Sequence, residues 1–360
     1  MTIVKINRLQ YFLLIPNLLF GKAIGITAGV MVRKLGADTW LSMTMGMAIG
    51  LLITILMVGL CSRHPDKTVI EFSEELLGKW VSRGIGLLLI LFFIMLYGAS
   101  ANTMVLHLSQ YLLPETPFLV ICLLYTVLCT YGVFLGVEVV VRFSFLGFLM
   151  LFLLSLTMVT GTIGDLKPIN LFPLMDNGFL ANIKGSIYIF GDLAMVILPI
   201  GFLYPMLNKQ EKVISLTFWS MVVAGILIII WPLFETMVLG PDLMKQYVVV
   251  CMQQIRCAQL TRYLPRYELI MVSFFTFCMF VQSATMFHCA QYSIKQVTGI
   301  KKDWIRIVPL ALVLVIVTYY MGKDHNDYVY FLSFPYSQIC AVFSICLPVI
   351  LLIASLIKRR

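Results

Sequence analysis

The chain contains ten apolar runs, each long enough to cross a lipid bilayer as a helix. A membrane helix needs about 20 predominantly apolar residues to span the hydrocarbon core. In chain order the runs are approximately Leu9–Met31, Thr39–Cys61, Gly84–Leu112, Pro117–Gly136, Phe143–Ile163, Gly185–Leu207, Val213–Leu239, Glu268–Val297, Trp304–Met321 and Tyr328–Ile357. Because they follow one another with short polar connections, we expect an all-α membrane protein, with residues 1–360 forming a single integral membrane domain.

The composition is typical of such a protein. Hydrophobic residues make up 61% of the chain and charged residues 12%, whereas soluble domains have about 45–50% and about 25%. In a soluble protein the formal net charge of +9 would suggest a nucleic-acid partner. Here the basic residues lie between apolar runs, where they indicate topology and contact with anionic lipid. We therefore expect the lipid bilayer, and no nucleic acid, as a partner.

The distribution of basic residues predicts the orientation. Sixteen Lys and Arg residues fall on the side of the N-terminus and nine on the other side, and the richer side of a membrane protein faces the cytoplasm. An even number of spans then places both termini in the cytoplasm.

Two connections are predicted to contain a helix of their own. Residues 64–83 have apolar positions spaced for an amphipathic helix on the inner interface, at Val69, Phe72, Leu76, Leu77 and Trp80. The segment 240–267 contains "LMKQYVVVCMQQI" and predicts a short surface helix on the outer side.

Ten spans suggest two repeats of five, about 9–163 and about 185–357. Inverted repeats place a substrate site where two discontinuous helices meet near the bilayer midplane. The first span of each half carries a Phe-Gly-charge tripeptide, Phe20-Gly21-Lys22 and Phe190-Gly191-Asp192. Glycine costs about 1 kcal/mol in a helix interior, so we expect broken helices 1 and 6. The alternative is that these glycines only allow close helix packing.

A break in each helix would suit a zwitterionic ligand. Unwound backbone in a membrane is tolerated where it faces protein, water or ligand. The carboxylate of an amino acid can bind helix N-termini, and its ammonium group can bind free carbonyls. The sequence therefore favours an amino acid held at the middle of the bilayer.

Two charged residues fall near the middle of these spans, Lys22 and Asp192. A charge at the bilayer centre costs at least about 2.5–3.5 kcal/mol, so we expect the two to form an ion pair or to be bridged by a ligand. The alternative is that Lys22 snorkels along a tilted helix. Glu235 lies near the outer end of the seventh run and is interpreted as a boundary residue.

The chain lacks the motifs of several enzyme classes. It has no GxxxxGK[ST] loop for ATP, no HExxH and no GxSxG. We expect no enzymatic activity and no cofactor.

Five segments together resemble a known family. They are "GADTWLSM" at 36–43, "RHPDKTVIEFSEELLGK" at 63–79, "LPETPFLVI" at 113–121, "GVEVVVRFS" at 136–144 and "LTRYLPRYELIMVSFF" at 260–275. Their order and spacing over ten spans resemble the B subunit of bacterial spore germinant receptors, a branch of the amino acid–polyamine–organocation transporter superfamily. The similarity runs from about residue 5 to residue 357.

The resemblance implies a leucine-transporter-like five-plus-five fold in the inner membrane of a spore. It implies a small nutrient germinant as ligand, and assembly with a receptor A subunit and a C-subunit lipoprotein. Family sites lie between spans one, three, six and eight. On this chain the corresponding positions are Gly21, Lys22, Ala23 and Gly25, Tyr97 and Ala101, Phe190, Gly191 and Asp192, and Phe277 and Val281.

The chain departs from the family at two of these positions. Family members generally have no lysine where this chain has Lys22, and span six often has a glutamate near the position of Asp192. A buried cation would favour a carboxylate-bearing ligand or replace the ion that transporters bind. Two other functions stay open beside the receptor subunit, namely an autonomous secondary amino-acid transporter and a structural membrane scaffold.

Overall fold

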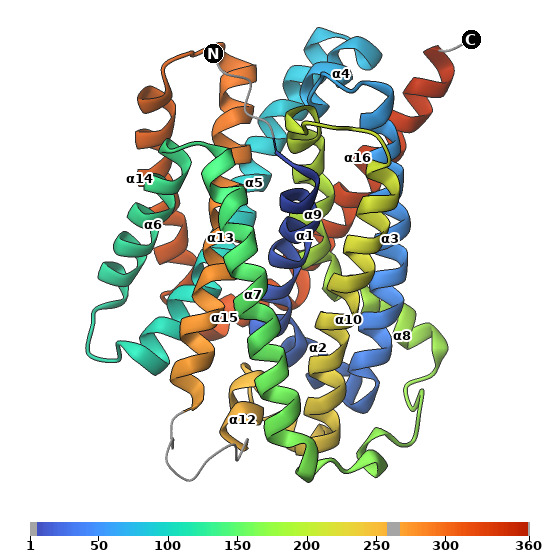
Figure 1. Cartoon of the computed structure of the whole chain (residues 1–360), viewed down its shortest axis with the longest axis vertical. Helices are drawn as coiled ribbons and strands as arrows, with labels where there is room; N and C mark the ends of the chain where they lie inside the picture. The colour runs from blue at the N-terminus through green and yellow to red at the C-terminus, as the bar shows by residue number, and fades with distance from the viewer. Residues whose placement is uncertain (1–5, 258–266, 359–360) are drawn as a thin grey trace.

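The computed structural model describes residues 6–257 and 267–358, which form one bundle of helices (Figure 1). The spanning segments are α1–α2 (Arg8–Lys22 and Ala28–Leu35), α3 (Thr39–Arg63), α5 (Lys79–His107), α6 (Phe118–Phe134), α7 (Val137–Thr162), α9 (Phe190–Leu203), α10 (Val213–Leu239), α13 (Tyr267–Thr298), α14 (Asp303–Gly322) and α15–α16 (His325–Phe331 and Ser337–Lys358).

These helices match the predicted apolar runs. Eight stretches of the described chain are long and apolar enough to cross a membrane. The first contains two spans, because only the short turn Gly36–Asp38 separates α2 from α3, and α6 is a shorter apolar helix of 17 residues. The ten runs thus correspond to ten helical segments in this part of the chain. The division into repeats, about 9–163 and 185–357, stays a prediction, since helix order alone does not relate two halves.

The middle of the bundle is formed by α1 and α9 (Figure 1). Every residue of α9 is buried, and so is every residue of α1 from Leu13 to Lys22. α1 packs against α7, α9, α10 and α13, whereas α9 packs mainly against α3 and α16. A helix that is apolar on all sides is buried on all sides, so these two helices are shielded from lipid.

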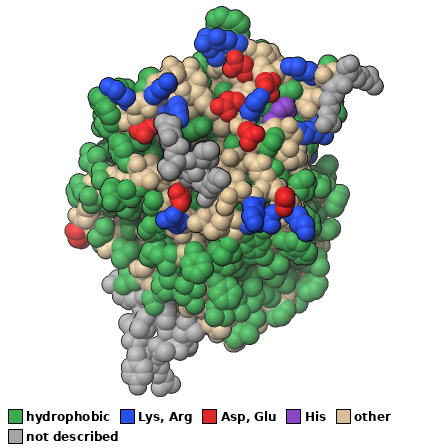
Figure 2. All heavy atoms as spheres, turned by 45° about the horizontal axis from the view of Figure 1, so that its top comes forward, with side chains coloured by type: hydrophobic (Ala, Val, Ile, Leu, Met, Phe, Trp, Pro, Cys, Tyr) green, Lys and Arg blue, Asp and Glu red, His purple; other side chains and the backbone are tan. Residues whose placement is uncertain are grey.

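The surface separates into an apolar belt and a charged end. Large apolar side chains such as Leu91, Leu124 and Ile226 are more than 60% exposed on the sides of the bundle. Charged side chains gather on the end that carries α4 (Val69–Leu77), where α1 begins and α16 ends (Figure 2). This arrangement is that of an integral membrane protein. We call this end the terminal face and the opposite end, which carries α12 (Val250–Cys257), the α12 face.

The amphipathic helix predicted in residues 64–83 is present but shorter. Thr68 and Glu71 form a capping box at the start of α4, and Gly78, with φ of +87°, ends it. The apolar side of α4, including Phe72, is buried. Trp80 was expected on the same face, but it belongs to α5 and is 80% exposed. The positive φ of Gly78 turns the chain between the two helices, which a pattern continued through position 78 does not anticipate.

The surface helix predicted in residues 240–267 is a buried one. The segment forms α11 (Pro241–Met244) and α12, and residues 258–266 lie outside the described part of the chain. Five of the eight residues of α12 are buried, because α12 packs on α7, α10 and α13. The backbone before α12 also approaches α2 closely, since a Cβ added at Gly29 would lie 1.9 Å from the carbonyl oxygen of Val248. This segment therefore covers the end of the first span.

Candidate ligand site at the centre of the bundle

The first span changes its helix type next to Lys22. α1 ends at Lys22 and is followed by a π-helix over Ala23–Thr27, in which the amide of Ala28 donates to the carbonyl of Ala23. Short π-helical stretches inside α-helices are frequent at functional sites. We expected an unwound break here. The interruption lies where it was predicted, but the wider turn keeps the backbone amides paired within the helix.

The sixth span changes its helix type at the matching tripeptide. A 3-10 turn over Ser186–Ile189 runs directly into α9, whose first three residues are Phe190, Gly191 and Asp192. The backbone stays helical here too. Asp192 lies in the first turn of α9, where the helix dipole stabilises a negative charge.

Lys22 and Asp192 form an ion pair at the point where the two spans meet. The Lys22 ammonium lies 3.1 Å from Oδ1 of Asp192, and the two side chains are 2% and 0% exposed. The ammonium also donates to the hydroxyl of Thr27 at 3.0 Å. The predicted pair is thus confirmed, and Lys22 does not snorkel to an interface. Oδ2 of Asp192 has no hydrogen-bond partner among the described residues.

Tyr336 completes the cage around the ammonium. It ends a π-helix over Leu332–Tyr336 in the last span, and its ring centroid lies 4.8 Å from Nζ of Lys22. A cation over an aromatic face is attracted by the ring quadrupole. Sequence reasoning missed Tyr336 and Thr27. Pro335, the residue before Tyr336, was the local sequence signal of an irregular turn at this point of the span.

A second polar layer joins α1, α5, α6 and α13. The hydroxyl of Ser100 donates to Oε1 of Gln282 at 2.8 Å and lies 2.8 Å from the hydroxyl of Ser283. Tyr125 donates to Ser283 at 3.0 Å, and the Gln282 amide donates to the carbonyl of Leu18 in α1. Gln282 and Ser283 therefore act as interhelical hydrogen-bonding residues.

Gly21 and Gly25 of the first span face α13 and α5. A Cβ at Gly21 would lie 2.3 Å from the sulfur of Met279, and a Cβ at Gly25 would lie 2.9 Å from Thr103 and 3.3 Å from His107. Nδ1 of His107 donates to the carbonyl of Thr103 at 2.7 Å. Its buried Nε2 has no partner within the described chain. This nitrogen and Oδ2 of Asp192 are unused polar atoms close to the first and sixth spans.

The other expected positions are distributed around this centre. Ala23, Ala101, Phe190 and Val281 are buried in their helices. Tyr97 is also buried, but its hydroxyl donates to Thr126 of α6 at 3.1 Å, so its polar end faces α6. Within the described chain, none of these side chains forms a hydrogen bond or an ion pair with Lys22 or Asp192.

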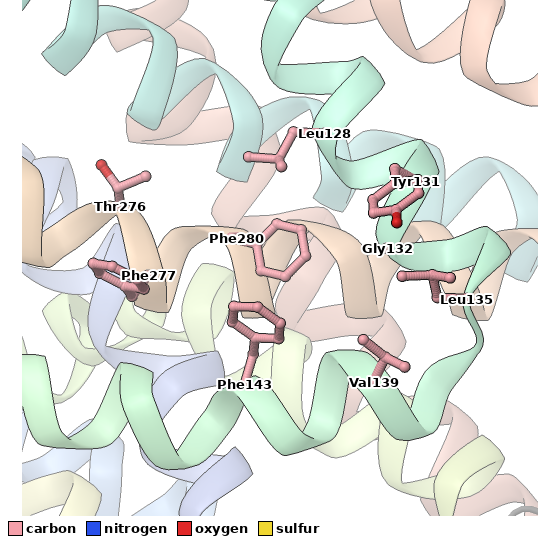
Figure 3. Close-up of a pocket in the computed structure, with 9 residues that line it drawn as sticks. All are labelled: Leu128, Tyr131, Gly132, Leu135, Val139, Phe143, Thr276, Phe277 and Phe280. Carbon is pink, nitrogen blue, oxygen red and sulfur yellow. The ribbon is translucent and has the colours of Figure 1, made fainter.

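Phe277 lies apart from the centre. It lines an apolar groove of about 260 Å³ between α6, α7 and α13, next to Thr276 and Phe280 (Figure 3). Leu128 and Tyr131 of the same groove are 46% and 64% exposed, so the groove opens on the membrane-facing side of the bundle. Successive residues of a helix point about 100° apart. The α13 side chains that face Gly21 are therefore not that of Phe277 but those of Cys278 and Met279, which follow it in the sequence.

The fold is similar to that of solved structures. A likeness over nearly the whole chain is found to MhsT in complex with L-phenylalanine, with a TM-score of 0.59, 13% identity and coverage of 97% of this chain and 98% of MhsT. A Na⁺-coupled sialic acid symporter gives a TM-score of 0.55 at 13% identity, covering 95% of this chain and 83% of the symporter. At these identities the likeness shows the fold, which is the expected transporter-like architecture.

Curated relatives are germination proteins. Spore germination protein KB of Bacillus subtilis is 26% identical over 274 residues, which are 73% of this chain and 71% of that protein. Spore germination protein YndE of the same organism is 21% identical and covers 99% of this chain and 98% of its own length. GerQB of Bacillus cereus is 21% identical over 89% of this chain and 88% of its own. Residues 5–327 match the spore germination protein family, and the chain therefore belongs to this family of integral membrane proteins.

Proposed function

We propose that the chain is the ligand-binding membrane subunit of a spore germinant receptor, and that an amino acid binds at the Lys22–Asp192 pair. The observation that carries this proposal is the ion pair itself, with 3.1 Å between the charged atoms and side chains 2% and 0% exposed. A buried pair on its own is weak support for stability, since removing two charges from water is expensive. Its position at the meeting point of two interrupted helices is better explained by binding.

A zwitterion matches this pair in charge and in chemistry. Its ammonium group can take the place of Lys22 at Asp192, while its carboxylate pairs with the Lys22 ammonium. All four charges then have a partner, which keeps the desolvation cost of each compensated. A neutral sugar or nucleoside would separate the pair without replacing either charge. Oδ2 of Asp192, unpartnered within the described chain, offers a further acceptor for the ligand.

Binding at this centre requires a movement of helices. The added Cβ contacts at Gly21 and Gly25 show that the first span already touches α5 and α13. Because α1 also packs directly on α9, a ligand enters between Lys22 and Asp192 only if α1 and α9 separate. A ligand shifts such an equilibrium by its differential affinity for the two states. In this proposal the movement passes to a receptor A subunit and a C-subunit lipoprotein in the spore inner membrane, with both termini cytoplasmic, and starts germination.

The test is thermal unfolding of the purified protein in the presence of single amino acids, sugars and nucleosides. A ligand that binds only the folded state adds about 2.7 kcal/mol of stability at a hundredfold excess over its Kd. We expect one amino acid to stabilise the wild type and to have no effect on the double variant Lys22→Met/Asp192→Leu, which leaves no buried charge unpaired. Stabilisation only by a sugar or nucleoside, or equal stabilisation of the double variant, would rule out the pair as an amino-acid site.

A secondary transporter is the second candidate. It is favoured by the fold, since one structural neighbour is a Na⁺-coupled sialic acid symporter and the other is MhsT in complex with L-phenylalanine. Uptake of the stabilising amino acid into proteoliposomes containing this chain alone separates the two functions. Uptake that requires Asp192 would establish a transporter, whereas binding without uptake, together with co-purification of the partner subunits, would establish the receptor.

A further inference from the structure

A second buried carboxyl lies near the α12 face, outside the Lys22–Asp192 centre. Glu235 of α10 is 0% exposed, and neither of its two carboxyl oxygens has a hydrogen-bond partner among the described residues. From the sequence it was interpreted as a residue of the membrane boundary. The structure places it in the interior, because α12 packs against both α7 and α10 and covers this part of the bundle.

The neighbours of Glu235 follow from the pairing of α10 with α7. One turn earlier in α10, the indole of Trp231 donates to the hydroxyl of Ser155 at 3.2 Å. One turn further along α7, Met158 accepts from the amide of Gln254 in α12 at 3.1 Å. Gln254 is therefore held at the level of Glu235. Its own Oε1 is buried and, within the described chain, also lacks a donor.

No counter-charge compensates Glu235 within the described residues. The titratable group that faces it from α12 is the thiol of Cys251, which is close enough to interact electrostatically. The basic residue of α12 is Arg256, whose guanidinium lies 4.0 Å from Glu268 of α13. Lys22 of α1 pairs with Asp192.

The remaining elements packed on α10 do not supply a cation either. On α3, the basic residue Arg63 lies in the last turn and donates to Ser355, and Asp38 before its first turn is an anion that accepts from the amide of Met175. On α11, Lys245 pairs with Asp242 at 3.3 Å. Lys167, just before the turn that packs on α10, is exposed. Arg8 of α1 and Arg142 of α7 lie on the terminal face, paired with Glu211 and Glu138.

We infer that Glu235 is a proton-binding site, closed by α12 and separate from the ligand centre. An ionised carboxylate moved into a medium of low dielectric without a partner is so unfavourable that the group takes up a proton instead. A protonated carboxyl can donate one hydrogen bond, and the buried Oε1 of Gln254 is a free acceptor at the same level. Asp192 is the contrasting case, since its buried carboxylate has the Lys22 ammonium as counter-charge.

Protonation of Glu235 makes the position of α12 dependent on pH. Proton release leaves a buried negative charge, which is tolerated only if water or a cation reaches Glu235. Because α12 covers this position, release requires α12 to move away. Protonation therefore favours the closed arrangement of the α12 face, and deprotonation favours the open one.

The first experiment measures unfolding of the purified protein as a function of pH, for the wild type and Glu235→Gln. Above about pH 5 an unfolded Glu is ionised, whereas Glu235 in the folded protein keeps its proton, so folding takes up one proton. Stability is then lost as pH rises, and the unfolding equilibrium constant of the wild type increases about tenfold per pH unit relative to the variant. If the ratio of the two unfolding equilibrium constants, wild type to Glu235→Gln, stays constant between pH 5 and pH 8, the inference is overturned.

Two controls make the result specific. Glu138→Gln removes a carboxylate that pairs with Arg142 on the terminal face. The unfolding equilibrium constant of the wild type, divided by that of this variant, is expected not to rise with pH in this range.

Labelling of Glu235 by a hydrophobic carbodiimide, which reacts with protonated carboxyls in apolar surroundings, is expected at pH 6. If sodium or potassium ions block this labelling and stabilise the wild type but not Glu235→Gln, the site holds a metal cation and not a proton. Glu235→Gln is expected to keep the amino-acid response, so the two proposals can fail independently.

Discussion

The hydroxyl of Tyr336 donates to the carbonyl oxygen of Gly191 at 2.9 Å, and the same ring lies beside the ammonium of Lys22. The last span is thereby bound to the backbone of the sixth span at the residue that precedes Asp192. A side chain at position 191 has no room, because an added Cβ would lie 2.5 Å from the Tyr336 ring and 3.3 Å from Nζ of Lys22. The glycine is required by close approach rather than by flexibility.

Gly191→Ala is therefore expected to destabilise the protein, although alanine is the better helix former by about 1 kcal/mol. Overpacking of a filled interior costs about 1–3 kcal/mol. Thermal unfolding in detergent measures the effect. Tyr336→Leu should suppress the loss by making space for the methyl group, whereas Tyr336→Phe should not, because it keeps the ring. Equal behaviour of the two suppressors would show that the clash is not with the ring.

The Lys22–Asp192 pair predicts a strong coupling between two substitutions. Lys22→Met and Asp192→Leu are each expected to cost about 3–5 kcal/mol, because each leaves one charge buried without its partner. The double variant is expected to recover most of this loss, since neither charge remains. A double-mutant cycle of unfolding free energies measures the coupling. Additive losses would mean that the two charges are stabilised independently.

The close contact between Gly29 and Val248 predicts that a side chain at position 29 loosens the packing of α12. In Gly29→Ala the new methyl group meets a backbone carbonyl, which has no rotamer to move away, so the segment before α12 must shift. We expect faster maleimide labelling of Cys251, which is buried in α12, with the exposed Cys257 and Cys346 changed to Ser in all proteins. Gly59→Ala is the matched control, because a Cβ there meets no heavy atom within 4 Å. Equal labelling rates in both variants would contradict the contact.

The position of the ligand predicts opposite outcomes for two residues named from the family site. Gly25→Leu forces the first span away from Thr103 and Phe275, which a Cβ at this position would already meet, and is expected to weaken amino-acid binding at least about tenfold, or 1.4 kcal/mol. Phe277→Leu changes only the membrane-facing groove and should leave the affinity unchanged. Titration of the thermal midpoint with ligand gives both values. Loss of affinity in Phe277→Leu alone would move the site to the groove.

The sequence was sufficient for the spans and for the central pair. Runs of about 20 apolar residues have few other solutions in a bilayer, and a lone charge in the middle of each of two such runs requires a partner. The residues around the pair were harder to find. Thr27 reaches Lys22 only because a π-helix follows residue 22, and residues three and four apart, not five, are neighbours on an α-helix.

The rotation of α13 about its axis and the covering of α10 by α12 explain the other differences between the expected and the observed positions. Phe277 and Cys278 are adjacent in sequence, yet one faces the groove and the other faces Gly21, so an uncertainty of one residue in helix phase moves a side chain out of the site. Glu235 was assigned to the boundary by its distance along α10. Its burial depends on α12, a segment whose packing on α7 and α10 is a tertiary property that no local pattern encodes.

The separation of Lys22 and Asp192 along the chain, 170 residues, has a consequence for biosynthesis. At about 5–20 residues per second of synthesis, Lys22 enters the membrane roughly 10–30 s before Asp192 has been made. During this interval the first span is a helix with an uncompensated charge, and its residence in the bilayer depends on the translocation machinery or on neighbouring spans. The sixth span therefore completes the insertion of the first one, and the order in which this protein is synthesised is not the order in which it becomes stable.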